Sequence, residues 1–333
     1  MSAVFVHGLG AVSPAGWGVP ALTQAISAGV PLTTQTLARP GWESPLRVRT
    51  VPSPPERPAF LAHPRLRRSG VMTQHILAAA LEALAEDAAI IQAGELRLGV
   101  IVCMMAGGVT YSRRFYEEVL QQPATASPLV FPETVFNAPA SHLSAYLRSP
   151  TVNYTLVGDD GMFLQGLALA ADWLELDRAD ACLVAGAEEM DWIVADAVRM
   201  FRRGAVYGGG AGAVYLKKDA LAPVALAAVT DSCSFTQNHR RPAAVRKMVA
   251  QLGPGFRDEL LCTGDPQPLL RETYPGPHLA LKPLLGEAFV ASAAWQCVAA
   301  CAAVAQKNHR SAAVAVTGTN QQVIGARFVA AVA

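Results

Sequence analysis

Two adjacent carboxylates, Asp159 and Asp160, directly precede a predicted helix and are flanked by Gly158 and Gly161. An aspartate at such a position most often caps the helix, because its carboxylate accepts hydrogen bonds from the first backbone N–H groups. A pair of carboxylates before a helix is also a candidate for acid–base or hydrolytic chemistry. The residue types favour the helix cap and leave the chemistry as the alternative.

The cysteines and histidines indicate neither a disulfide framework nor a metal site. The six cysteines are scattered, mostly in apolar runs, and none forms a CxxC pair. This usage is typical of buried, reduced thiols in a cytoplasmic protein. The seven histidines show no HxxxH-like spacing, so we expect no metal and no cofactor. We expect His142 to be a packed or surface residue rather than a catalyst.

The composition excludes several classes of protein. Of the 333 residues, 52% are hydrophobic and only 16% are charged, so much surface must be buried in a wide core or against a partner. The formal net charge of +1 creates no global attraction to nucleic acid or to a membrane surface. We expect no membrane span, since charges, Gly or Pro interrupt every apolar run, and no signal peptide, since the first residues lack a basic region.

Strand-like apolar runs alternate with helix-like stretches along the chain. Residues 98–103 and 181–186 have the continuous apolar character of strands that are buried on both faces. Residues 72–88 and 161–176 have the composition of helices. This alternation predicts an α/β protein with a mostly parallel, buried sheet.

The same order of elements recurs in the last third of the chain. A strand-like run at 224–229 opens the repeat, and a long Ala-rich helix at 289–306 corresponds to the helix at 161–176. We interpret the chain as two similar halves, an N-terminal half over 1–218 and a shortened C-terminal half over 219–333.

The first half resembles the β-ketoacyl-[acyl carrier protein] synthases along nearly its whole length. The segments that carry the resemblance follow that family's order and spacing, at 4–29, 67–87, 97–108, 131–189 and 208–218. In the second half the best matches are 279–295 and 315–320. The resemblance implies an α/β protein with the thiolase-like duplicated fold, layered α-β-α-β-α.

The family's chemistry depends on a cysteine at a sharp turn before a helix, where the helix N-terminus lowers the thiol pKa and backbone N–H groups form an oxyanion hole. The resemblance places that position at Gly158, in the sequence Val-Gly-Asp-Asp-Gly. No Cys or Ser lies between Pro150 and Gly161 to replace it. Glycine has no side chain to acylate.

Two further family positions have lost their usual residues. The resemblance places the family's two histidines at Thr263 and Glu287, and it retains the family lysine as Lys282. A carboxylate at residue 287 would oppose the enolate charge that the histidines stabilise. An ordinary structural role is the alternative for the lysine. These losses predict that the chain does not catalyse condensation alone.

Basic residues before the first long helix suggest a docking site. The resemblance implies that Arg65, Arg67 and Arg68 receive an acidic acyl carrier protein, while a solvated charge cluster is the alternative. Arg202 and Arg203 are weaker candidates for the same role.

Phe131 and Phe136 lie where members of the family line the acyl tunnel near the dimer interface, although ordinary core aromatics would have the same appearance. Because the catalytic residues are lost, the resemblance implies a chain length factor of a type II polyketide synthase or of a fatty-acid-like pathway. Such a subunit forms a heterodimer with a Cys-containing ketosynthase and shapes its acyl tunnel. The short length and the Gly158 turn suggest a divergent branch, such as those of polyene or aryl polyene pathways.

Two other classes of function stay open. One is an enzyme with altered chemistry, a hydrolase or decarboxylase that uses Asp159, Asp160 or Glu287. The other is a scaffold that binds a carrier protein without any part in chain length.

Overall fold

Apolar runs without a polar interruption form the central strands of the molecule. In the computed structural model, β5 (Leu98–Met104) and β7 (Ala181–Glu188) are buried along their whole length. Strands of this kind need cover on both faces of their sheet, and helices provide it here. The structure describes residues 4–149, 152–253, 255–319 and 321–331.

One half of the central sheet comes from the first part of the chain. Its strands lie in the order β1 (Val4–Ser13), β9 (Gly210–Lys217), β7, β5 and β6 (Asn153–Val157). The pairs β5–β6 and β5–β7 are parallel, whereas β9 is antiparallel to both of its neighbours.

The other half of the sheet repeats this arrangement. Its strands lie in the order β10 (Val224–Val229), β15 (Gln322–Ala330), β14 (Ser311–Thr317), β12 (Leu260–Thr263) and β13 (His278–Ala280). The chain visits the five positions in the same sequence as in the first half, and the parallel and antiparallel pairs correspond. The expected duplicated α/β fold is therefore confirmed, while the division at 218/219 stays an interpretation.

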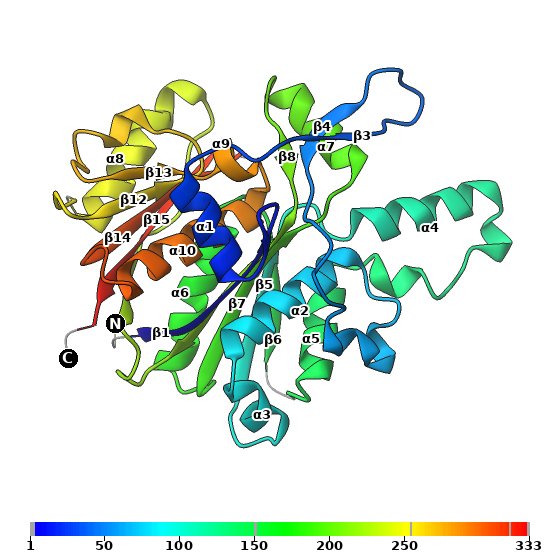
Figure 1. The fold of residues 1–333 in the computed structure, drawn as a ribbon, viewed down its shortest axis with the longest axis horizontal. Helices are drawn as coiled ribbons and strands as arrows, with labels where there is room; N and C mark the ends of the chain where they lie inside the picture. The colour runs from blue at the N-terminus through cyan, green and yellow to red at the C-terminus, as the bar shows by residue number, and fades with distance from the viewer. Residues whose placement is uncertain (1–3, 150–151, 254, 320, 332–333) are drawn as a thin grey trace.

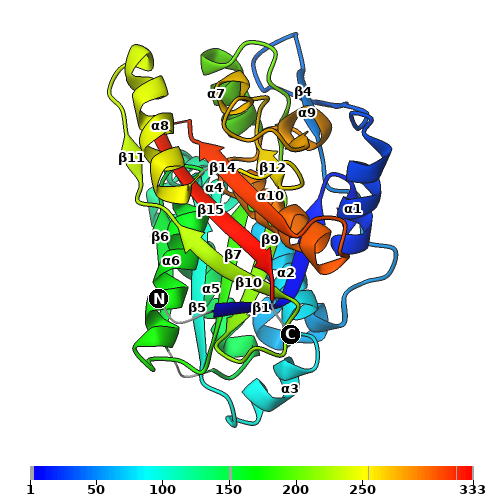
Figure 2. The same ribbon diagram turned by 90° about the vertical axis from the view of Figure 1, so that its left-hand side faces the viewer.

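Helices complete five layers. Buried faces of α6 (Met162–Glu175) and α10 (Phe289–Ala305) share one hydrophobic core with strands of both halves of the sheet. On the outer faces, α2 (Val71–Leu84) and α5 (Ala138–Tyr146) pack against the first half, and α8 (Arg241–Leu252) packs against the second. Figures 1 and 2 show α6 and α10 between the two halves.

Two glycines in β1 let a helix approach the sheet closely. A Cβ atom at Gly8 would lie 1.8 Å from the carbonyl oxygen of Ala83, and one at Gly10 would lie 1.8 Å from that of Ala79. Both carbonyls belong to the Ala-rich helix α2. Small residues on the helix and glycine on the strand therefore determine together how closely this layer packs.

A protruding helix and a small second sheet complete the fold. In Figure 1, α4 (Val109–Gln121) extends away from the body, and none of its residues is buried. A three-stranded sheet has the order β3 (Gln35–Leu37), β4 (Leu46–Arg49) and β8 (Tyr207–Gly208). The other elements are β2 (Gly16–Trp17), α1 (Val19–Ala28), α3 (Asp87–Gln92), α7 (Trp192–Phe201), β11 (Cys233–Ser234) and α9 (Lys282–Leu285), with short 3-10 turns between them.

The expectations for the cysteines and for His142 are met. All six cysteines are free and buried. His142 is buried beside Glu133, with 2.7 Å between Nε2 and the carboxylate oxygen Oε1, as expected for a packed residue. No helix within the described ranges is long and apolar enough to cross a bilayer, and the same ranges contain no group of three or more His, Cys, Asp or Glu side chains placed to hold a metal ion.

Candidate functional site

The turn between β6 and α6 presents no side chain at residue 158. The Gly158 N–H donates to the Met104 carbonyl at 3.1 Å, which holds the end of β6 beside β5. A Cβ atom at Gly158 would lie 2.9 Å from Cγ of Met162, one helical turn further on. The position therefore lacks a nucleophile, and the Met162 side chain occupies the space in front of it.

The expected helix cap by Asp159 or Asp160 is wrong. The N-cap of α6 is Gly161, and no side chain caps the helix. The carboxylate of Asp159 is buried against Gly318, where a Cβ atom would lie 1.9 Å from Asp159 Oδ2. Asp160 is 1% exposed, and its carboxylate accepts a hydrogen bond from a lysine. The Asp160 carboxylate therefore forms an ion pair and does not cap the helix.

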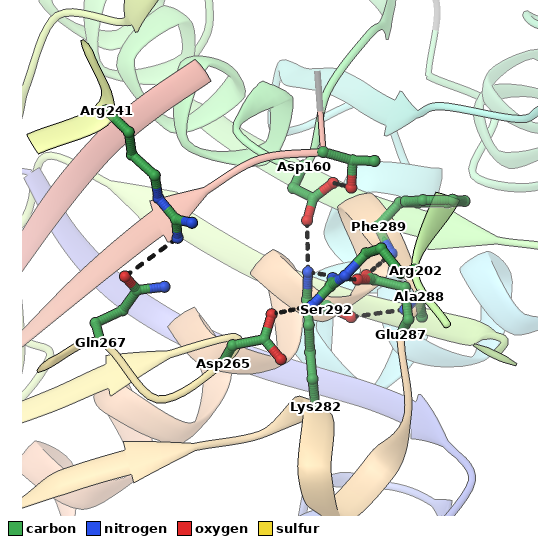
Figure 3. Close-up of polar contacts among 11 residues, drawn as sticks. Asp160, Arg202, Arg241, Asp265, Gln267, Lys282, Glu287, Ala288, Phe289 and Ser292 are labelled. Atoms are coloured by element: carbon green, nitrogen blue, oxygen red, sulfur yellow. Dashed lines mark hydrogen bonds and ion pairs between the residues drawn. The ribbon is translucent and has the colours of Figure 1, made fainter. Parts of the chain in front are cut away.

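Lys282 lies between two buried carboxylates. Its Nζ is 2.8 Å from Oδ2 of Asp160 and 2.8 Å from Oε2 of Glu287 (Figure 3). The end of β12 positions the lysine, since Leu281 N–H donates to the Thr263 carbonyl at 3.0 Å. The structure thus brings together the turn before α6, Thr263, Lys282 and Glu287, which the sequence had placed in one site.

The network extends beyond these residues to Arg202 and Asp265. Arg202 donates through Nη1 to Glu287 Oε2 at 2.5 Å and through Nη2 to Asp265 Oδ2 at 2.5 Å (Figure 3). The other Glu287 oxygen accepts from the Phe289 N–H at 3.0 Å, at the start of α10. Three carboxylates and two cations therefore join α6, α9, α10 and two loops.

The electrostatics of this network favour a charged lysine. Burial alone would lower the pKa of Lys282, but Asp160 and Glu287 outweigh burial and raise the lysine pKa above its usual value. Burial raises the pKa of Glu287, and the neighbouring Asp160 adds to the rise, against the opposing effect of Lys282 and Arg202. Asp160 and Glu287 are both held by cations, so neither is presented as a free general base.

Sequence reasoning missed two members of this region. Asp265 lies in a loop, and its partner Arg202 is 63 positions away, so no local pattern indicates the pair. Glu188, at the end of β7, is fully buried and accepts from Met105 N–H at 2.6 Å and from Ala106 N–H at 3.1 Å. Burial raises the pKa of Glu188 to about 8, although both hydrogen bonds oppose the rise. The sequence feature that could have identified Glu188 is a charged residue at the end of an otherwise apolar, buried strand.

Phe131 and Phe136 lie on the surface, so the alternative of core aromatics is wrong. Phe131 is 53% exposed, with its ring centroid 5.4 Å from that of Phe115 on α4. Phe136 is 43% exposed and lies against Gly107, whose Cβ would be 2.6 Å from the ring. Tyr154 and Val157, on the edge strand β6, are exposed as well.

The arginines before α2 are also exposed. Arg65, Arg67 and Arg68 have no carboxylate partner among the residues described, although Arg65 donates to Ser141 Oγ at 3.1 Å. Their charges are therefore available to a binding partner. Their role in docking stays a prediction.

Comparison with known proteins identifies the architecture. No known family model and no curated protein matches the sequence. Among solved structures, the ishigamide ketosynthase/chain length factor matches with a TM-score of 0.81 and 20% identity, over 98% of this chain and 99% of that one. This chain has the ketosynthase fold. The type II PKS ketosynthase AntDE, bound to the hexaketide and in complex with its acyl-carrier protein AntF, matches with a TM-score of 0.82 and 16% identity, over 99% of each chain.

A third structure with the ketosynthase fold is the ketosynthase ApeO in complex with its chain length factor ApeC from Xenorhabdus doucetiae. It matches with a TM-score of 0.79 and 14% identity, over 99% of this chain and 98% of that one. Identities this low establish the fold, and the side chains of this chain must carry any argument about function.

Proposed function

We propose that this chain is a non-catalytic, ketosynthase-like chain length factor that pairs with an active, Cys-containing ketosynthase in type II polyketide biosynthesis. The observation that carries the proposal is the Gly158 turn, which lacks a nucleophile and is filled by Met162. Lys282 beside it is neutralised by Asp160 and Glu287. A ketosynthase fold with this interior can shape a partner's site but has no group to acylate at this turn.

An exposed apolar edge supports the pairing. Strand β6 has only one neighbour in the described sheet, and it presents Tyr154 and Val157 at 48% and 46% exposure. Unpaired strand edges with apolar side chains favour pairing with another chain. Phe131 and Phe136 are also exposed and would be covered by a partner. Two of the similar structures contain a ketosynthase with a chain length factor.

A carrier protein is the second proposed partner. Arg65, Arg67 and Arg68 form an exposed cationic group without carboxylate partners among the described residues. Such a group suits the acidic surface expected of a carrier protein. One similar structure contains a ketosynthase in complex with its acyl-carrier protein.

The geometry argues against the hydrolase or decarboxylase alternative. That reaction would need a carboxylate free to accept a proton, whereas Asp160 and Glu287 are ion-paired and Asp159 is packed against Gly318. The scaffold alternative differs from the proposal in one respect, since a scaffold would not influence product length.

Co-expression with the ketosynthase of a neighbouring gene tests the proposal. We expect the two chains to co-purify in a 1:1 complex that elongates carrier-bound substrates, and we expect activity to disappear when the partner's catalytic cysteine is replaced. The isolated chain should show no turnover. Turnover by the isolated chain, or a ketosynthase that gives the same products without this chain, would contradict the proposal.

A further inference from the structure

A cavity of about 400 Å³ opens beside the ion network of Lys282. Its lining is strongly cationic and includes Arg47, Arg49, Arg202, Arg203, Lys282, Asp265 and Glu287. The two carboxylates are already bound by Arg202 and Lys282. The remaining three arginines of the lining have no carboxylate partner among the described residues, so the cavity carries an excess of positive charge.

Arg49 gives this cavity the character of a built site. It lies at the end of β4, is only 8% exposed, and donates through Nε to the Leu32 carbonyl at 2.8 Å. A buried guanidinium without an anion is costly, and a second cation beside it adds repulsion. Both effects are present, since burial and then the charge of Arg47 lower the pKa of Arg49. An anion bound in the cavity would relieve both.

We propose that this cavity binds a small ligand through a phosphate group. A phosphate has more acceptor oxygens and a larger negative charge than a carboxylate, so it is better matched to a cavity that presents several arginines at once. Arg47, Arg49 and Arg203 line the same cavity and supply these donors. The volume of about 400 Å³ exceeds that of a bare phosphate and leaves space for an organic group.

This site is distinct from the role of a chain length factor, because it concerns a cavity of this chain and not the partner's tunnel. The site also makes no use of the exposed arginines before α2 or of the edge strand β6. Experiments can therefore disprove the phosphate site and the role as a chain length factor independently of each other.

Titration calorimetry of the purified chain, or of its complex with the ketosynthase, tests the site. The probes are inorganic phosphate and glycerol 3-phosphate, with acetate as the carboxylate comparison, in chloride buffer at constant ionic strength. We expect saturable binding of both phosphates and none of acetate. Arg47→Gln and Arg49→Gln should each weaken phosphate binding about tenfold or more, the usual effect of losing a charge-assisted hydrogen bond.

Arg246→Gln is the matched control, because Arg246 is an exposed arginine on the remote helix α8 and its replacement changes the net charge equally. It should bind phosphate as the unmodified chain does.

Arg47 is exposed, so the Arg47→Gln result stands even if replacement of the buried Arg49 impairs folding. Absence of saturable phosphate binding, or equal affinities of Arg47→Gln and Arg246→Gln, would overturn the proposal. Acetate binding as tight as phosphate would overturn the ligand class. We expect Arg47→Gln to co-purify with the ketosynthase as before, so that loss of phosphate binding can be distinguished from loss of pairing.

Discussion

Lys282 illustrates how one side chain can hold several elements together. Its Nζ contacts Asp160 before α6 and Glu287 before α10, at 2.8 Å in each case. The lysine is only 8% exposed, and Asp160 and Glu287 are 1% and 3% exposed, so the three charges are buried together. Removal of the ammonium group would leave buried negative charge without adequate compensation.

We therefore expect Lys282→Met to lower the free energy of unfolding by about 3–5 kcal/mol at pH 7.5. The loss should be smaller at pH 5. Lys282 opposes the rise that burial causes in the folded-state pKa of Glu287, so without the lysine this pKa rises further. Protonation of Glu287 then stabilises the folded variant at low pH, and this contribution is lost as pH rises through the folded pKa. Urea unfolding at the two pH values measures both effects. The exposed Lys247→Met on α8 is the control, and an equal loss at both pH values would contradict the role of Glu287.

The thiols and the Gly158 turn predict chemical inertness. Burial raises the pKa of Cys182 and of Cys262 to about 12, so the thiolate is scarce at neutral pH. The native chain should acquire no stoichiometric adduct from an acyl carrier protein or from a cysteine-directed inhibitor. Intact-mass spectrometry checks this, and all six cysteines should react once the chain is unfolded. A single stoichiometric adduct mapped to residues 157–161 would contradict the non-catalytic assignment.

At the scale of elements, the segment before α2 presents its arginines to solvent. Because Arg67 and Arg68 are exposed, reversing both to Glu should leave the fold intact. We expect the double variant to bind the carrier protein at least about tenfold more weakly at low salt, with a smaller salt dependence. Binding titrations at two salt concentrations measure this. Charge reversal at Arg246 and Lys247 on α8 is the matched control, and equal carrier affinities for the two double variants would remove this patch from the proposal.

The 131–137 segment, which begins with a short 3-10 turn, is the candidate gate of the partner's tunnel. Phe136→Ala should cost less than the roughly 3–5 kcal/mol of a buried ring, because the ring is 43% exposed. Given an intact complex, products should shift towards longer chains, since the ring no longer fills the path. Mass spectrometry of the products tests this, with the exposed Phe256→Ala as control. An unchanged product distribution would make Phe131 the next candidate, and failure of both would favour the scaffold alternative.

For the whole molecule, the duplicated sheet ends in two outer strands, β6 and β13. Strand β6 presents the exposed Val157, which lies on the edge proposed to meet the ketosynthase. Val157→Asp should weaken co-purification about tenfold or more, because a carboxylate would be buried without a partner in the interface. The melting temperature of the isolated chain should change little. Val30→Asp, at a position 65% exposed, is the matched control, and undiminished pairing of Val157→Asp would exclude this edge.

The sequence predicted the elements with strong local signals. β5 is apolar throughout, β7 is apolar up to its last residue, and α10 has only two polar residues, so their burial leaves few alternative structures. The helix cap by Asp159 or Asp160 failed for a physical reason. The Asp160 carboxylate pairs instead with Lys282, which is 122 positions away, and a local pattern contains no trace of that partner.

By itself, the sequence determined that the turn at Gly158 has no nucleophile and that the chain must bury an unusually apolar interior. Both properties depend only on residue types and on their order along the chain, and the sequence contains this information in full. Only the tertiary structure decided that Lys282 is neutralised, that Phe131 and Phe136 are exposed, and that the buried Arg49 lines a cavity together with other arginines. Burial and ion pairing depend on segments that are distant in the chain and meet only in the folded molecule, so their consequences appear only there.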